Sequence, residues 1–96
     1  MPGRPRMIAR QFLISGEVQG VGYRYFALRS AAKHQVSGFA RNLADGRVEV
    51  WAEGPQRAVE EFRHDLAAGP TYSNVTTVEE IAVEPTNSYP TFRIEN

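Results

Sequence analysis

The apolar positions along this chain follow two periods, one typical of strands and one typical of helices. From 47 to 53 they alternate, with Val48, Val50 and Ala52 on one side and Glu49, Trp51 and Glu53 on the other, which predicts a half-buried strand. Other apolar-rich segments predict four further strands, at 8–15, 36–42, 75–84 and 91–95.

Two other segments carry apolar residues at helical spacing and predict helices. The first spans 23–34 and is rich in Ala, the residue with the highest helix propensity. Its expected apolar face consists of Tyr25, Leu28, Ala31 and Ala32. The second follows Gly54-Pro55, with the proline expected in its first turn, and is ended by Gly69-Pro70. Its expected apolar face consists of Ala58, Val59, Phe62 and Leu66.

Glycine and proline separate these segments and fix their order. Gly16 to Gly22 holds three glycines and predicts a loop, Ala44-Asp45-Gly46 predicts a hairpin turn, and 85–90 predicts another turn. The order is strand, helix, strand, strand, helix, strand, with a short strand at the end. This order predicts an α+β, ferredoxin-like βαββαβ fold with two helices on one face of an antiparallel sheet. We expect residues 1–6 to be a flexible tail and 7–96 to be one domain.

Composition excludes several classes of function. The chain has 96 residues and no cysteine, which excludes disulfides, thiolate metal sites and a cysteine nucleophile. Its formal net charge is zero, whereas nucleic-acid-binding proteins usually carry a basic excess. No apolar run approaches the roughly 20 residues of a membrane span, and no apolar segment follows the basic N-terminus as in a signal peptide. We therefore expect a cytoplasmic protein with no membrane or nucleic-acid partner, and its small size and zero charge favour a monomer.

The most informative segment is Gly16–Arg24, between the first strand and the first helix. Glycines allow consecutive backbone N–H groups to point into one concavity, and a helix N-terminus adds unpaired N–H groups. Arg24 in the first helical turn could grip a phosphate with two N–H groups. Neither GxxxxGK[ST] nor GxGxxG is present, so nucleotide binding is not indicated. On these residues alone, a turn that merely joins strand to helix explains the glycines equally well.

Two motifs in the chain resemble those of the acylphosphatases. GxVQGVxYR at 16–24 resembles the first signature of that family, and Gly38-Phe39-Ala40-Arg41-Asn42 followed by Gly46-Arg47-Val48 and Gly54 resembles the second. The resemblance covers 7–95 and implies hydrolysis of the mixed anhydride between a carboxylate and a phosphate. The chain departs from the family pattern at Glu17, at Tyr23 where Phe is commoner, and at its end, Arg93–Asn96, where many relatives have an aromatic residue after an arginine.

The resemblance also implies roles for particular residues. The backbone cradle for the phosphoryl group would be formed by Gln19, Gly20, Val21, Gly22 and Tyr23. Arg24 would bind the phosphate and Asn42 would hold the attacking water, with no metal, cofactor or covalent intermediate. An acyl phosphate suits such a site, because its carboxylate leaving group needs little acid catalysis and the enzyme supplies positioning and charge neutralisation. No residue is identified that recognises the acyl group. Small acyl phosphates in general are therefore the expected substrates, and inorganic phosphate is an expected product.

Two alternative functions remain open at this point. One is a non-catalytic module that keeps the phosphate cradle without turnover. The other is a ferredoxin-like RNA-binding domain with Trp51 as a stacking platform, although Glu49 and Glu53 flank Trp51 and would repel a phosphate backbone. His34 and His64, 30 positions apart without nearby metal-ligating partners, are interpreted as surface histidines, and the pairs Glu60-Glu61 and Glu79-Glu80 as solvated charge.

Overall fold

The computed structural model describes residues 6–96, so the predicted tail over 1–6 lies outside the described residues except for Arg6. Seven elements follow one another: β1 (Met7–Glu17), α1 (Tyr23–His34), β2 (Ser37–Asn42), β3 (Val48–Pro55), α2 (Gln56–Ala68), β4 (Asn74–Val83) and β5 (Phe92–Glu95). Every predicted strand and helix is therefore present, and α1 has the predicted bounds. Pro55 lies one residue before the helix rather than in its first turn, as the N-cap of α2.

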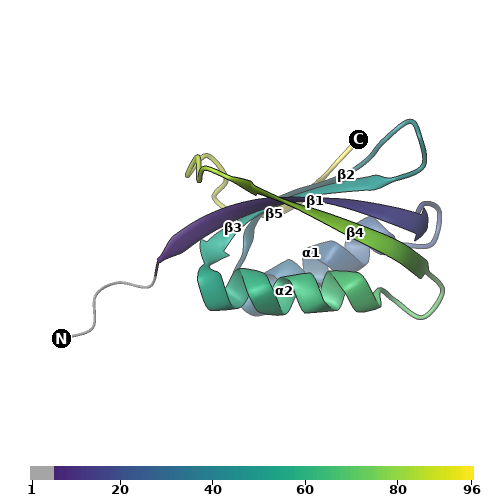
Figure 1. The fold of residues 1–96 in the computed structure, drawn as a ribbon, viewed down its shortest axis with the longest axis horizontal. Coiled ribbons are helices and arrows are strands. Elements are labelled where there is room, and N and C mark those ends of the chain that lie inside the picture. Colours follow the sequence, from purple (N-terminus) through teal and green to yellow (C-terminus); the bar gives the residue numbers. More distant parts are fainter. Residues whose placement is uncertain (1–5) are drawn as a thin grey trace.

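The five strands form one sheet in the order β4-β1-β3-β2-β5. β1 pairs antiparallel with β3 and β4, and β2 pairs antiparallel with β3, which is the predicted ferredoxin-like arrangement. β5 lies parallel to β2 and makes the sheet mixed. Both helices cover the same face of the sheet (Figure 1). None of the helices within residues 6–96 is long and apolar enough to cross a membrane.

The core lies between the sheet and the two helices. Phe12 and Ile14 of β1 and the alternating apolar residues of β3 are fully buried there, as the period-two pattern predicts. α2 buries Val59, Phe62 and Leu66, in agreement with its predicted face. The predicted face of α1 is confirmed at Ala31 and wrong at Tyr25 and Ala32. α1 buries Tyr23, Ala27, Ser30 and Ala31, while Tyr25 and Ala32 are exposed and Leu28 is half-buried.

The face of the sheet away from the helices holds two buried carboxylates. Glu49 and Glu53 are only 8% and 3% exposed, so the expectation of an exposed charged face on β3 is wrong. Glu49 accepts hydrogen bonds from Gln11 and from the guanidinium of Arg41. Glu53 is covered by the segment between β4 and β5, where Thr86 donates to its carboxylate. Partners from distant strands and loops thus compensate the cost of burying these charges.

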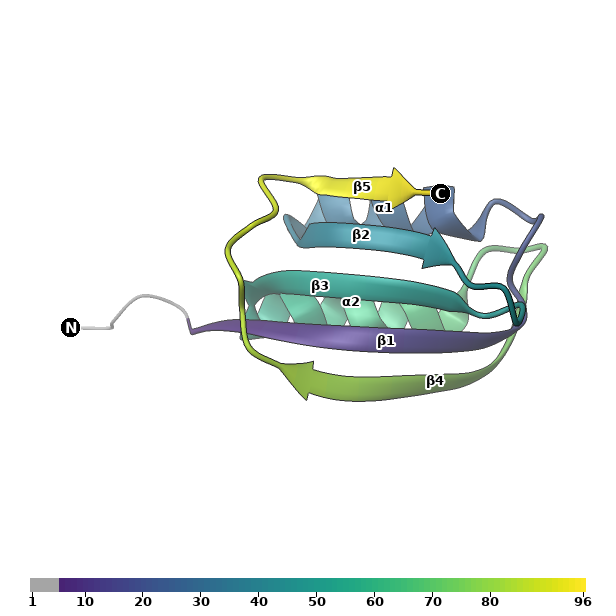
Figure 2. The ribbon, with the colours of Figure 1, turned by 90° about the horizontal axis from the view of Figure 1, so that it is seen from above.

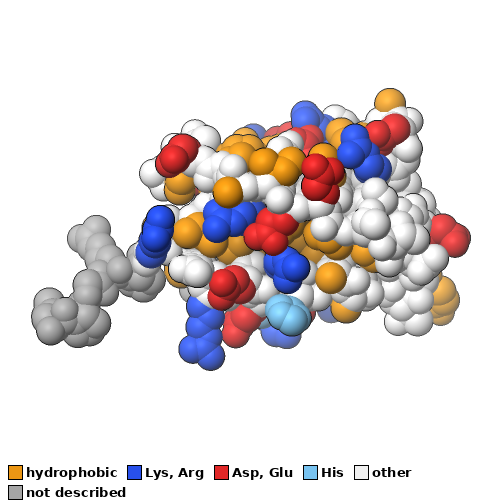
Figure 3. Space-filling model, in the orientation of Figure 1, with side chains coloured by type: hydrophobic (Ala, Val, Ile, Leu, Met, Phe, Trp, Pro, Cys, Tyr) orange, Lys and Arg blue, Asp and Glu red, His pale blue; other side chains and the backbone are white. Residues whose placement is uncertain are grey.

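β4 is an edge strand and carries charge on its surface. Glu80 forms ion pairs with Arg10 of β1 at 3.3 Å and with Arg63 of α2 at 2.8 Å. On the face of the molecule shown in Figure 3, side chains of both signs are interspersed rather than gathered by sign. Charge on an edge strand disfavours pairing with another edge.

Strand direction decides where a site can form. β1 and β2 are both antiparallel to β3, and β5 is parallel to β2, so all three run the same way. Their carboxyl ends therefore meet at one end of the sheet, where the loop into α1 also begins (Figure 2). Segments that are far apart in the sequence are brought together there: the 18–22 loop, the end of β2 and the C-terminus of the described chain.

Candidate active site

The loop between β1 and α1 presents backbone N–H groups rather than side chains. Gly20 and Gly22 have φ of 77° and 80°, which glycine adopts without strain. A Cβ at either position would meet nothing within 4 Å, so open space lies beside both glycines. No amide of residues 19–25 donates to a backbone carbonyl among residues 6–96, and Phe26 N, at 3.0 Å from Gly22 O, makes the first bond of the helix. The loop therefore offers a run of free donors of the kind that binds anions.

The N-terminus of α1 strengthens this preference for negative charge. Gly22 is its N-cap, no side chain caps it, and its first turn contains no acidic residue. The partial positive charge of the helix end is therefore not neutralised by its own cap or first turn. Glu17, the acidic residue of the first motif, lies exposed at the end of β1 opposite Asn74 and is not among the residues that line the cavity described below.

Arg24 lies in the first turn of α1 and reaches the end of β5. Its Nη1 donates to the backbone oxygen of Glu95 at 3.0 Å and to Asn96 Oδ1 at 3.4 Å. A guanidinium has five N–H donors, so most remain for a ligand. The contact also fixes β5 relative to the helix, a role of the C-terminal residues that the motifs did not indicate.

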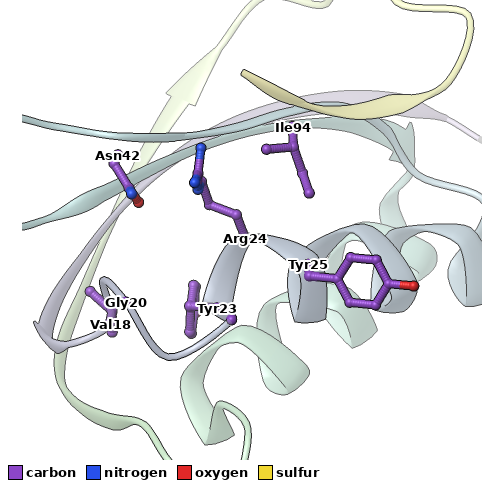
Figure 4. A pocket seen from close by; sticks show the side chains of 8 residues that line it. Val18, Gly20, Tyr23, Arg24, Tyr25, Asn42 and Ile94 are labelled. Carbon is purple, nitrogen blue, oxygen red and sulfur yellow. The ribbon is translucent and has the colours of Figure 1, made fainter. Parts of the chain in front are cut away.

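Asn42 is the last residue of β2 and approaches from the sheet. It shares the parity of buried Ala40, so its side chain points to the helix side of the sheet, toward the loop (Figure 4). Its Oδ1 is the one buried side-chain nitrogen or oxygen within residues 6–96 that has no hydrogen-bond partner. An unpaired buried acceptor is destabilising, which points to a functional reason for this amide.

The side chain of Gln19 links the loop to the hairpin that follows Asn42. Its Nε2 donates to the backbone oxygens of Leu43 at 2.8 Å and Arg47 at 2.9 Å. Leu43 N in turn donates to Arg47 O at 2.8 Å and closes the predicted turn. Gln19 therefore fixes the distance between the loop and Asn42 through its side chain, in addition to any donation by its backbone amide.

Tyr23 anchors the start of α1 in the core. Its ring is fully buried, and its hydroxyl donates to Leu66 O of α2 at 2.7 Å. Burial raises the pKa of the Tyr23 phenol, so the hydroxyl is protonated and acts as a donor at neutral pH. Tyr23 thus holds the helix N-terminus in place.

These elements enclose a cavity of about 170 Å³, lined by Val18, Gly20, Gly22, Tyr23, Arg24, Tyr25, Asn42 and Ile94. Five of the seven predicted site residues line it. The other two turn elsewhere: the side chain of Gln19 bonds to the hairpin, and that of Val21 packs against the core. Val18, Tyr25 and Ile94 were not predicted, since an apolar residue at a cavity has no motif of its own.

Two of the other candidate residues, His34 and Trp51, have structural partners. His64 is exposed, as interpreted, but the interpretation of His34 as a surface histidine is wrong, because its side chain is only 13% exposed. His34 Nε2 lies 2.9 Å from Asp65 Oδ2, which also accepts from Ser30 Oγ at 2.7 Å, so His34 joins α1 to α2. The indole N–H of Trp51 donates to Glu53 at 2.7 Å. No group of three or more His, Cys, Asp or Glu residues within the described chain is arranged to hold a metal ion.

Several known proteins resemble this chain in sequence and in fold. The acylphosphatase family model matches residues 10–94. An acylphosphatase of Thermus thermophilus is 53% identical over 75 residues, covering 78% of this chain and 82% of its own. The crystal structure of acylphosphatase from Bacillus subtilis superposes with a TM-score of 0.89 at 34% identity, covering 93% of this chain and 99% of its own. A structure of full-length HypF in a phosphate- and nucleotide-bound form superposes with a TM-score of 0.86 at 29% identity, covering 99% of this chain but 13% of its own.

Proposed function

The chain belongs to the acylphosphatase family, and we propose that it hydrolyses small acyl phosphates by direct attack of a water molecule held by Asn42, with the phosphoryl group bound by the 19–24 loop and Arg24. The family supports acyl phosphate hydrolysis, with a carboxylate and inorganic phosphate as products. The observation that carries the proposed mechanism is that unpaired backbone amides, a guanidinium and an unpaired amide side chain meet in one cavity.

Binding of the phosphoryl group follows from the donors around the cavity. Gly20, Gly22 and Tyr23, whose backbone N–H groups have no backbone acceptor, line the same cavity as the guanidinium of Arg24. Together these donors can neutralise the oxygens of the phosphoryl group. Because these donors are fixed by the helix and by the contact of Arg24 with Glu95, they need little reorganisation in the transition state.

Attack on phosphorus then requires a water molecule in line with the leaving group. The Asn42 amide can accept from a water through Oδ1, and rotation about χ2, a broad torsion, would turn this buried oxygen toward the cavity. An amide is no base at neutral pH. The water oxygen bonds to phosphorus as the bond from phosphorus to the acyl oxygen breaks. The electron pair leaves with the carboxylate, and the proton of the water passes to a phosphate oxygen.

Hydrolysis of benzoyl phosphate in excess EDTA tests this mechanism in the parent and in the Arg24→Ala and Asn42→Ala variants. Arg63→Ala and Asn74→Ala serve as controls, because neither residue lines the cavity. We expect turnover by the parent with chelator present. Arg24→Ala should lower kcat/KM by about 10³-fold or more, and Asn42→Ala should lower kcat by about 10²- to 10³-fold with phosphate affinity retained. Full turnover by Asn42→Ala would refute its role in holding water. A folded parent that binds phosphate without turnover would instead be a non-catalytic module.

We also propose that the protein acts as a monomer. β4, one edge of the sheet, carries exposed Glu79 and Glu80, and the opposite edge strand β5 has only four residues. Short or charged edges disfavour sheet extension between copies. Light scattering after size-exclusion chromatography should give a mass near 10.7 kDa, and a mass of twice that value would contradict the proposal.

A further inference from the structure

We propose that Tyr25 and Ile94 form the surface that receives the acyl group, and that they favour acyl phosphates with an apolar, above all an aromatic, acyl group. This inference rests on the proposed function, since it concerns the other end of the same substrate. The sequence motifs identify no residue that contacts the acyl group, and this inference assigns that contact to Tyr25 and Ile94.

The exposure of these two side chains is the first observation. Four large apolar residues within 6–96 are exposed: Met7, Tyr25, Tyr72 and Ile94. Tyr25 is 58% and Ile94 36% exposed, and both line the cavity that contains Arg24 and Asn42. Single exposed apolar residues are ordinary, but two from separate elements at one cavity form a surface that a ligand can cover.

The fold explains why both side chains are presented there. Tyr23 occupies the buried face of the first turn of α1, which leaves Tyr25 facing outward. On β5, alternation places Ile94 on the same side as buried Phe92, toward α1. The bond from Arg24 Nη1 to Glu95 O, 3.0 Å long, holds the end of β5 beside the helix. Ile94 is thereby fixed relative to the phosphate-binding donors.

The reaction geometry places the acyl group on this side of the cavity. In an in-line displacement the attacking and leaving oxygens lie on opposite sides of phosphorus. Figure 4 shows Asn42 on one side of the Arg24 side chain, with Ile94 and Tyr25 on the other. A water held at Asn42 therefore directs the leaving carboxylate toward Ile94 and Tyr25.

The chemistry of the lining then indicates the class of acyl group. No acidic residue lines the cavity, and its single cation, Arg24, belongs to the phosphoryl end. An acyl group with a second charge would find no partner, whereas an apolar group would cover the Ile94 side chain and the Tyr25 ring. A benzoyl group fits this surface better than an acetyl group, because it has more apolar area to bury.

The test compares benzoyl phosphate with acetyl phosphate for the parent, Tyr25→Ser, Ile94→Ser and Tyr72→Ser. The quantity measured is the ratio of kcat/KM for the two substrates. We expect Tyr25→Ser and Ile94→Ser each to lower this ratio about fivefold to tenfold, mainly through KM for benzoyl phosphate, because the acyl contact exists in both ground and transition states. Tyr25→Phe should keep the parent ratio, and so should Tyr72→Ser, which changes an exposed apolar residue that does not line the cavity.

The outcomes separate this inference from the proposed function. Parent turnover with an unchanged ratio in both serine variants, each with the far-UV spectrum of the parent, would overturn the acyl surface and leave the mechanism intact. Absence of turnover of both substrates by a folded parent would overturn the proposed function and this inference with it. An equal fall in the kcat/KM ratio of Tyr72→Ser would refute a local role for Tyr25 and Ile94.

Discussion

Glu53 offers the sharpest test of how this fold is held together. Its buried carboxylate accepts from Trp51 Nε1 at 2.7 Å, from the N–H and hydroxyl of Thr86 at 3.1 and 2.7 Å, and from Asn87 N at 2.9 Å. Thr86 and Asn87 belong to the segment that leads from β4 to β5. Glu53 therefore holds this segment against the sheet by hydrogen bonds. Glu53→Gln changes these hydrogen bonds while keeping the side-chain volume nearly the same.

The size of the effect follows from the donors that Gln would leave unmatched. The amide keeps one oxygen and presents an NH₂ group to positions where only donors point, so at least two charge-assisted bonds are lost. At roughly 1.5–3 kcal/mol each and with partial relaxation, we expect the free energy of unfolding to fall by about 3 kcal/mol at pH 7. For a domain of this size that is a decrease in Tm of roughly 12–24 °C.

The pH dependence provides an independent check. Burial alone would raise the pKa of Glu53, but hydrogen bonds from Trp51, Asn87 and Thr86 outweigh it and hold the pKa below its ordinary value of 4.5. A carboxyl with a lowered pKa in the folded state stabilises the protein above its unfolded pKa, and this stabilisation is lost as pH falls through the folded value. The difference between parent and Glu53→Gln should therefore shrink below about pH 4.5.

Urea unfolding at pH 7 and at several acidic pH values measures both quantities, with Glu79→Gln on exposed β4 as the matched control. The control should stay within about 0.5 kcal/mol of the parent. A Glu53→Gln variant as stable as that control at pH 7, or a difference that does not shrink in acid, would refute this account.

Two further changes test the supports of the site. Gln19→Ala removes the bonds to Leu43 O and Arg47 O, so we expect kcat for benzoyl phosphate to fall about tenfold or more while phosphate affinity, measured by titration, changes little. An unchanged kcat would show that the hairpin is placed without Gln19. Tyr23→Phe removes the buried bond to Leu66 O and should lower the free energy of unfolding by about 1–2 kcal/mol in urea, and equal stability would contradict the importance of this bond.

Much of the fold could be predicted because it depends on local patterns. The alternation over 47–53, the glycines of 16–22 and the helical spacing from Ala58 to Leu66 each act within a few residues, and each predicted element is present. The burial of Tyr23 rather than Tyr25 on α1 could not be predicted in this way. Tyr23 and Tyr25 are both amphipathic aromatics, and only the packing of Tyr23 against α2, with its bond to Leu66 O, decides which is buried.

The buried carboxylates of β3 escaped prediction for a related reason. Alternation correctly placed Glu49 and Glu53 on the face opposite Val48 and Val50, and an uncovered face would have left them in solvent. What buries Glu53 is the segment around Thr86, more than 30 positions along the chain, and Glu49 needs Gln11 and Arg41 from neighbouring strands. Such partners depend on strand order, which no local period encodes.

In the site, too, a local motif revealed some residues, whereas their partners became known only from the fold. The hydrogen bonds that hold the site in place explain which departures from the family pattern it tolerates. Gln19 binds the backbone oxygens of Leu43 and Arg47, Tyr23 binds that of Leu66, and Arg24 binds that of Glu95. Each support has a specific donor side chain and an acceptor that any residue supplies. Gln19 and Arg24 are therefore constrained in identity, and both belong to the first motif. Tyr23 stands where Phe is commoner in the family, and its hydroxyl adds a bond that Phe could not make. The acceptor side is free to vary, so Glu95 and Asn96, neither of which is aromatic, still hold Arg24 beside the cavity.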